Sequence, residues 1–238
     1  MAVAYDASTD GGYTNSGTTR TFSHTATGSN CVLIVGSWTR SSGANAVTGI
    51  TFDIGGVPTP MVPLGTEIIP AHSSGDEYIR LWGLEIGTGA GTGKNIVISC
   101  PSGMESIVWA SSYTGASLPD ATSNQAETTS TDTVCSVTTV TDNSWAIVLY
   151  RDSGGAGSAG AGATFRTYGL SSGGTGCYDT NSAKTPAGSF SLTVSHGSAP
   201  NGYQMAAIPP YSAPSTQIKS RNGVLIANVK SANGVPNT

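Results

Sequence analysis

The strongest constraint on the fold of this chain is the spacing of its glycine, serine, threonine and proline residues, which interrupt every apolar run after a few positions. No window keeps apolar residues at positions i, i+3 and i+4, the pattern of an amphipathic helix. The apolar runs have the length of strands instead, and about ten to twelve strands are expected. The clearest lie at residues 31–39, 78–86, 95–100, 106–113, 144–150, 189–194 and 203–208. The sequence therefore predicts an all-β chain, an antiparallel β-sandwich or jelly roll.

The chain is expected to divide near the proline pair at 209–210, because proline cannot continue a strand in the middle of a sheet. Residues 1–210 are predicted to form the β-sandwich domain, residues 211–216 a linker, and residues 217–238 a short β-rich C-terminal tail.

Two segments inside the predicted sandwich are expected to be connections. Asp142 and Asn143 predict a tight hairpin turn between strands at 133–141 and 144–150. Residues 153–163, SGGAGSAGAGA, have low complexity and predict a mobile loop.

The composition favours a particular kind of surface. Only 10% of the residues are charged, against a usual value of about 25%. Such an uncharged polar surface is typical of secreted and virion β-proteins. No run of about 18 apolar residues suggests a membrane-spanning helix. The N-terminus shows no signal-peptide pattern, so a chain made in the cytoplasm and not exported by that route is expected.

Charge is distributed unevenly along the chain. Residues 1–179 contain 14 acidic and six basic residues, a net charge of −8, whereas residues 180–238 contain four basic residues and no acidic one. Four positive charges in so long a segment are too few to indicate binding to nucleic acid. They favour contact with an acidic protein surface.

The tail contains a short repeat. Residues 218–224 read IKSRNGV, and residues 229–235 read VKSANGV. Each Asn-Gly pair predicts a type I′ turn, and so short a segment cannot bury much apolar surface alone. The tail is therefore predicted to dock on a partner chain by strand pairing. The residues expected to make this contact are Lys219, Arg221, Val224, Leu225, Ile226, Val229 and Lys230.

One string resembles a hydrolase motif. Gly169–Gly173 fits the pattern G-x-S-x-G around Ser171, and Asp179 and His196 follow in the order found in hydrolases. A nucleophile elbow needs a helix after the serine, and none is predicted here. The sequence therefore predicts no catalytic residue and no enzyme activity.

Histidine and cysteine spacings predict no metal site and no cofactor. His24 is expected to make a structural hydrogen bond within a strand. Cys31, Cys100, Cys135 and Cys177 are expected to be buried free thiols, with a disulfide bridge as the alternative. A calcium ion near Asp76, Glu77 or Asp120 remains an open alternative.

The four tryptophans, Trp38, Trp82, Trp109 and Trp145, lie in apolar strands and are expected mainly to fill the core. Trp82 points opposite to Leu81 in the predicted strand. It is therefore the best candidate for an exposed platform that binds a glycan.

Several stretches together resemble a known family. In order they are residues 4–7 (AYDA), 22–25 (FSHT), 32–36 (VLIVG), 79–84 (IRLWGL), 112–116 (SYTGA) and 205–208 (MAAI). This order is similar to a widespread β-sandwich family of bacteriophage minor tail and other virion proteins and of secreted bacterial surface proteins. The tail is similar to the IKxxNGV-type repeats that end some phage-like proteins. The chain departs from the family pattern at Ala116, where valine is expected, and in the glycine-rich insertion.

The resemblance implies a β-sandwich over residues 3–210 and brings no catalytic residues. We expect a non-enzymatic structural protein of a bacteriophage virion, such as a capsid decoration, minor tail or fibre component. Its expected partners are other virion proteins and further copies of itself, and possible ligands are host-surface glycans. The alternative is an extracellular carbohydrate-binding or adhesive module secreted by a bacterium.

Overall fold

The computed structural model describes residues 1–15, 17–41, 47–68, 76–101, 104–128, 131–152, 157–169, 174–197, 201–213, 219–221 and 224–226. The described residues form strands and no helix, and every strand pair is antiparallel. This confirms the predicted all-β fold. None of the described segments is a helix long and apolar enough to cross a membrane.

The strands of the first half are β1 (Ala4–Thr14), β2 (Thr19–His24), β3 (Cys31–Ser41), β4 (Gly49–Ile54), β5 (Val57–Pro60), β6 (Val62–Ile68), β7 (Asp76–Gly87), β8 (Lys94–Ser99) and β9 (Glu105–Thr114). Those of the second half are β10 (Ala121–Thr128), β11 (Asp132–Thr138), β12 (Trp145–Asp152), β13 (Ser158–Ala159), β14 (Thr164–Gly169), β15 (Thr175–Asp179), β16 (Ser189–Ser195) and β17 (Asn201–Ile208). The tail contributes β18 (Lys219–Arg221) and β19 (Val224–Ile226).

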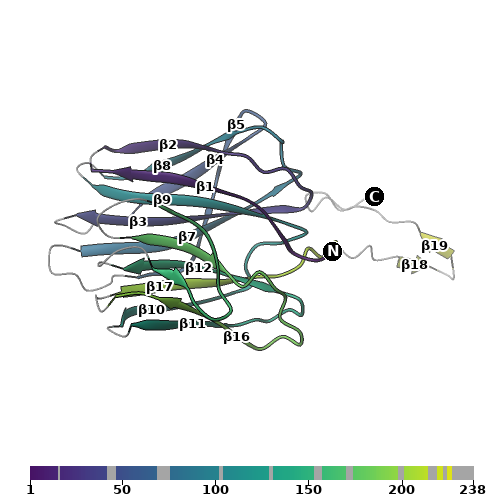
Figure 1. Ribbon diagram of the computed structural model, residues 1–238. Helices are drawn as coiled ribbons and strands as arrows, with labels where there is room; N and C mark the ends of the chain where they lie inside the picture. The colour runs from purple at the N-terminus through teal and green to yellow at the C-terminus, as the bar shows by residue number, and fades with distance from the viewer. Residues whose placement is uncertain are drawn as a thin grey trace.

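The strands of the body stack in four layers (Figure 1). The two central sheets have the orders β1-β9-β3-β7-β6 and β10-β17-β12-β15-β14. The sheet β2-β8-β4-β5 covers the outer face of the first, and the sheet β11-β16-β13 covers the outer face of the second. The described part of the chain therefore forms more strands and more layers than the sequence predicts.

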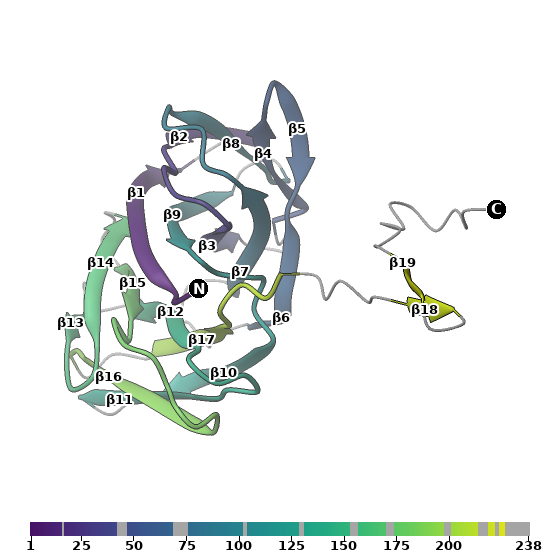
Figure 2. The ribbon, with the colours of Figure 1, turned by 90° about the vertical axis from the view of Figure 1, so that its right-hand side faces the viewer.

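The two halves of the body repeat one topology. If β5 is set aside, β1–β9 and β10–β17 each supply eight strands in chain order. In each half the central sheet has the order first-eighth-third-sixth-fifth, and the outer sheet the order second-seventh-fourth. Such an eight-stranded pair of sheets is a jelly roll. The protein thus contains two tandem jelly rolls, with β1 beside β14 and β6 beside β10 at the edges of their interface (Figure 2).

The layering explains the apolar pattern of the strands. The central strands β9, β12 and β17 are covered on both faces and are buried along almost their whole length. The outer strands β8, β11 and β16 face solvent on one side and alternate buried with more exposed residues. Three separate apolar cores result, one between the central sheets and one beneath each outer sheet.

Both predicted connections need correction. Residues 158 and 159, inside the segment predicted as a loop, form β13 and pair with β16. Asp142 and Asn143 do lie in a turn, and Asn143 has a positive φ of 64°. However, β11 belongs to an outer sheet and β12 to a central sheet, so the two strands do not pair. The turn is an arch from one layer to the next. A turn signal alone cannot distinguish an arch from a hairpin.

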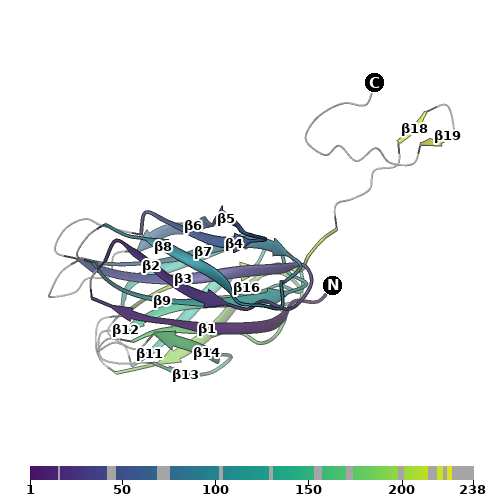
Figure 3. The same ribbon diagram turned by 90° about the horizontal axis from the view of Figure 1, so that it is seen from above.

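The connections divide the body into two ends. The links β1–β2, β3–β4, β6–β7, β8–β9, β10–β11, β12–β13, β14–β15 and β16–β17 all leave from one end, which we call the distal end. The N-terminus and residues 209–213 lie at the opposite, proximal end (Figure 3). At the proximal end Tyr211 donates its backbone N–H to the carbonyl of Gly115.

Candidate functional site

The described part of the tail contains the predicted hairpin. β18 and β19 pair antiparallel, with Lys219 opposite Ile226 and Arg221 opposite Val224. Asn222 and Gly223, for which the sequence predicts the type I′ turn, lie outside the described residues. Ser220 and Leu225 complete the register. Neither strand pairs with a described strand of the body.

The second half of the predicted docking segment, including Val229 and Lys230, lies outside the described residues. The involvement of the tail in docking therefore remains a prediction. For the first half of the segment, the structure shows only that β18 and β19 pair with each other.

The prediction that Trp82 is an exposed platform is wrong. Trp82 is 5% exposed and belongs to the core between the sheet of β7 and the outer sheet β2-β8-β4-β5. Its indole Nε1 donates to Ser37 Oγ at 3.1 Å, and the Arg80 guanidinium lies 5.5 Å from the ring centroid. In a two-layered sandwich one face of β7 would be exposed to solvent. In the structure the outer sheet β2-β8-β4-β5 covers that face.

A buried ion pair joins the two jelly rolls near the distal end. Glu77 of β7 accepts a hydrogen bond from Arg151 Nη2 of β12 at 2.8 Å, and both side chains are almost completely buried. Trp38 Nε1 donates to the other Glu77 oxygen at 3.0 Å, and the Arg151 guanidinium lies 4.8 Å from the Trp38 ring centroid. A buried charge is strongly destabilising unless it has a partner of opposite charge, and Glu77 and Arg151 supply that partner to each other.

Two polar atoms beside this pair have no hydrogen-bond partner within the described ranges. They are Arg151 Nε and Thr175 Oγ1, on strands that place these two residues directly opposite each other. A second ion pair, between Arg40 and Glu105 at 2.6 Å, lies at the same end and is partly exposed. The distal end of the central core is thus closed by charged groups instead of apolar ones.

A neighbouring cluster lies under the outer sheet of the second jelly roll. His196 Nε2 is 2.9 Å from Thr133 Oγ1 and 3.1 Å from Asn201 Nδ2. Its Nδ1 lies 3.9 Å from Asp152 Oδ2 and contacts the carbonyl of Gly197. These contacts tie the ends of β11, β12, β16 and β17 together.

The hydrolase-like string does not assemble into a triad among the described residues. Ser171 lies outside them. Asp179 faces the central core, whereas His196 contacts Tyr150 in the core on the opposite face of the same sheet. The two side chains have separate partners.

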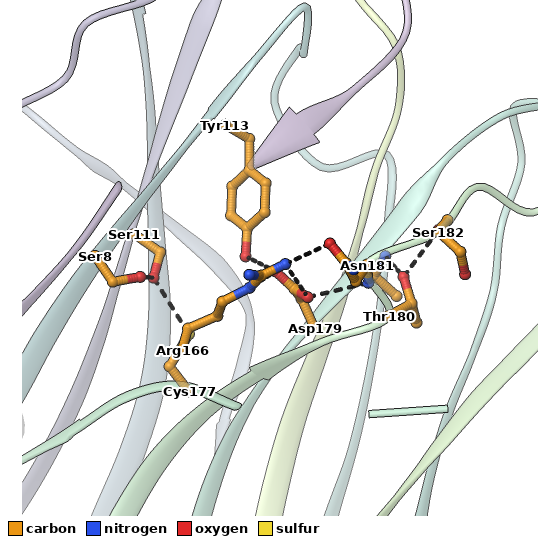
Figure 4. A network of polar contacts seen from close by, with 10 residues as sticks. Ser8, Ser111, Tyr113, Arg166, Cys177, Asp179, Thr180, Asn181 and Ser182 are labelled. Carbon is orange, nitrogen blue, oxygen red and sulfur yellow. Dashed lines mark hydrogen bonds and ion pairs between the residues drawn. The ribbon is translucent and has the colours of Figure 1, made fainter. Parts of the chain in front are cut away.

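Asp179 instead organises a polar network between the jelly rolls (Figure 4). Its carboxylate accepts hydrogen bonds from Tyr113 Oη at 2.8 Å and from Arg166 Nε and Nη2 at 2.7 and 3.0 Å. The backbone N–H of Asn181 donates to the same carboxylate at 3.0 Å. Tyr5 lies beneath the Arg166 guanidinium, 3.9 Å from the ring centroid.

The network is electrostatically consistent. Burial, followed by the charge of Asp179, raises the pKa of Tyr113 well above its usual value. Burial alone lowers the pKa of Arg166, but its hydrogen bonds to Asp179 and the charge of that carboxylate outweigh burial and raise it. Tyr113 therefore stays a neutral donor and Arg166 a cation.

His24 makes the structural hydrogen bonds that the sequence predicts. Its Nδ1 lies 2.9 Å from Thr9 Oγ1, and its Nε2 lies 3.0 Å from Ser112 Oγ. Ser112 in turn donates to Asp6 Oδ2 at 2.6 Å, and Asp6 accepts the backbone N–H of Thr27. Burial lowers the pKa of His24 to about 4, against a weaker raising effect of Asp6. The imidazole is neutral at physiological pH.

The cysteines are free thiols, and only Cys100 is not fully buried. Within the described part of the chain, no three His, Cys, Asp or Glu side chains come together as metal ligands. Glu77, one of the open calcium candidates, is occupied by Arg151 and Trp38.

The structure shows an exposed aromatic pair that sequence reasoning missed. Phe165 and Tyr168 on β14 are 38% and 36% exposed, and their ring centroids lie 4.9 Å apart. In a regular strand residues 165 and 168 would point to opposite faces. A register shift between Phe165 and Thr167 places both rings on the outer face. No sequence pattern marks the position of this bulge.

Comparison with known proteins adds no relative. No protein-family model matches the chain, and neither the curated proteins nor the solved structures contain a match. The function of the chain is therefore inferred from its geometry and from its sequence motifs.

Proposed function

We propose that this protein is a non-enzymatic structural protein of a bacteriophage virion. In this proposal the double jelly roll projects from the particle, and the C-terminal tail anchors it to capsid or tail subunits or to other copies of itself. The observation that carries the proposal is the placement of the ends. Both termini of the body lie at the proximal end, and the eight distal connections face away from it.

The body has the properties that such a role requires. Buried polar groups between the two jelly rolls are paired at both ends, by Glu77 with Arg151 and by Asp179 with Arg166. Buried ion pairs that join two units favour one relative position of those units, because any other position would separate the paired charges. A rigid body with an attachment at one end presents its distal connections at a fixed distance from the particle.

Charge supports the role of the tail. Residues 180–238 are basic without a single acid, whereas the rest of the chain has a net charge of −8. A basic tail is steered towards acidic surfaces, while affinity comes from strand pairing and burial of Val224, Leu225 and Ile226.

The test is incorporation into particles. Full-length protein and a variant lacking residues 217–238 are expressed during phage production, and purified particles are probed for each. We expect the full-length chain to co-purify with particles, and the shortened chain to remain folded and soluble but free. Equal incorporation of both chains, or absence of both from the particles, would contradict the proposal.

A second candidate function is favoured by the exposed pair Phe165 and Tyr168. Aromatic faces beside small uncharged residues suit the stacking of a sugar ring, so an extracellular adhesive module would use β14 to bind a glycan. Retention of the protein on gels that contain host-surface polysaccharide tests this candidate. Retention should disappear in the variant Phe165→Ala/Tyr168→Ala and persist after removal of the tail.

A further inference from the structure

The outer sheets of the two jelly rolls differ by one strand. In the first, the outer sheet has four strands, because β5 pairs with the free side of β4. In the second, β13 corresponds to β4, and none of the described strands corresponds to β5. The outer sheet β11-β16-β13 therefore has an open strand position beside β13.

The open position lies over exposed aromatic side chains. In the first jelly roll the order of the sheets places β5 over β6, and the strand that corresponds to β6 in the second is β14. The outer face of β14 carries Phe165 and Tyr168, both more than one-third exposed. A strand added beside β13 would cover these two rings.

The two outer edges also differ in how they are protected against strand addition. β5 carries Pro58 and Pro60, which lack the N–H groups that an added strand would bind. Residues 157–163, GSAGAGA, contain neither proline nor charge. Gly160 donates its N–H to Thr193 of β16, so strand alternation directs the N–H of Ala159 towards the open side.

The chain contains a segment suited to this position. β18 and β19 form a hairpin that pairs with no described strand of the body, and β19 is the apolar sequence Val224–Ile226. Residues 211–213 leave the body towards β6, on the opposite side from β13 and β14 (Figure 2). The geometry therefore favours the tail of another molecule over the tail of the same one.

We infer that the C-terminal hairpin of one copy of this chain adds to β13 of a second copy and covers Phe165 and Tyr168. The inference rests on the proposed role of the tail as a docking segment, and it names a second copy of the chain as the partner. Because the contact is head-to-tail, it is heterologous and can continue from copy to copy.

Cross-linking between two full-length variants tests the contact. In a Cys100→Ser background, one variant carries Ala159→Cys and the other, with a size tag, carries Ser220→Cys or Leu225→Cys. After mixing and mild oxidation, we expect a disulfide-linked heterodimer with at least one of the tail positions. A matched control replaces Ala159→Cys by Val57→Cys, which is 63% exposed on the proline-protected edge β5. We expect at least about ten-fold less heterodimer from it, since β5 cannot accept a strand.

Three outcomes overturn the inference: no heterodimer, equal yields from Ala159→Cys and Val57→Cys, or an exclusively intrachain disulfide when both cysteines are in one molecule. If the inference fails while removal of residues 217–238 still abolishes incorporation into particles, the tail docks on another virion protein and the proposed function stands. Continued incorporation of the shortened chain would instead contradict the proposed function itself.

A second variant tests the edge without altering the tail. Ala159→Pro removes the outward N–H and copies the protection of β5, while the ladder bond of Gly160 to β16 is kept. We expect this full-length variant to lose self-association, measured by sedimentation at increasing concentration, with an unchanged far-UV spectrum. Unchanged self-association, or a wild-type chain that stays monomeric throughout, would count against the inference.

Discussion

Glu77 in the first jelly roll and Arg151 in the second form an ion pair of 2.8 Å whose side chains are 2% and 3% exposed. Each of the two charges has its ionic partner in the other jelly roll. The pair therefore favours correct docking of the two halves, because a misaligned interface would leave two charges buried without partners.

Arg151→Met should lower the free energy of unfolding by roughly 3–5 kcal/mol, since Glu77 loses its buried cationic partner. Denaturant titration followed by intrinsic fluorescence measures the effect. The double variant Glu77→Gln/Arg151→Met keeps an acceptor for Trp38 Nε1 and should recover most of the loss. As a control, Arg40→Met breaks the partly exposed pair with Glu105 and should cost less than about 1 kcal/mol.

Acid should destabilise the protein through His24. Its pKa is about 4 in the folded state and ordinarily about 6.5, so above pH 6.5 the imidazole is neutral in both states. As the pH falls from 6.5 to 4, the unfolded chain binds a proton that the folded chain does not, and about 3 kcal/mol of stability is lost. Denaturant titrations at several pH values in this range give the free energy of unfolding at each pH. This free energy should fall more steeply with decreasing pH for the wild type than for His24→Gln. Equal slopes would show that His24 does not cause the effect.

Gly36→Ala should destabilise the body because a Cβ at this position would lie 2.3 Å from the Trp109 ring. Overpacking of a buried strand costs about 1–3 kcal/mol. Gly49→Ala is the matched control, because apart from its neighbours in the chain no atom lies within 4 Å of the position that its new methyl group would take. The control should change stability by less than about 0.5 kcal/mol. Similar losses in both variants would point to a backbone effect instead of the tryptophan contact.

Thiol titration should separate the cysteines. Cys31, Cys135 and Cys177 are buried, and burial raises the pKa of each thiol, so an aromatic disulfide reagent should not label them in the native protein. Cys100 is half-buried and should react slowly. After unfolding, all four thiols should react. A lower total in denaturant would reveal a disulfide bridge.

The all-β class, the free thiols and the structural role of His24 could be predicted because each depends on local pattern. Runs such as residues 106–113 are apolar on both faces, which is the mark of a strand covered on both sides. The same mark could have indicated more than two layers, but the order of strands across sheets is set by pairings distant in the chain. For that reason the predictions for Trp82 and for the turn at Asp142 and Asn143 are wrong.

The candidate site was harder to predict than the fold. Glu77 and Arg151 are 74 residues apart, and no spacing rule brings them together. Phe165 and Tyr168 share a face only because a bulge intervenes. The pairing of β18 with β19, in contrast, is what the Asn-Gly signal in the sequence predicts, so these strands were predictable while their partner was not.

Residues 1 and 213, the two ends of the body, both lie at the proximal end, and this placement limits how the protein can be used to carry cargo. If the tail attaches the protein as proposed, a peptide or domain fused to either terminus would lie next to the attachment, and its bulk would obstruct docking. Cargo meant to face outward belongs instead in a distal connection such as that between β3 and β4, which lies in the first jelly roll, away from β13.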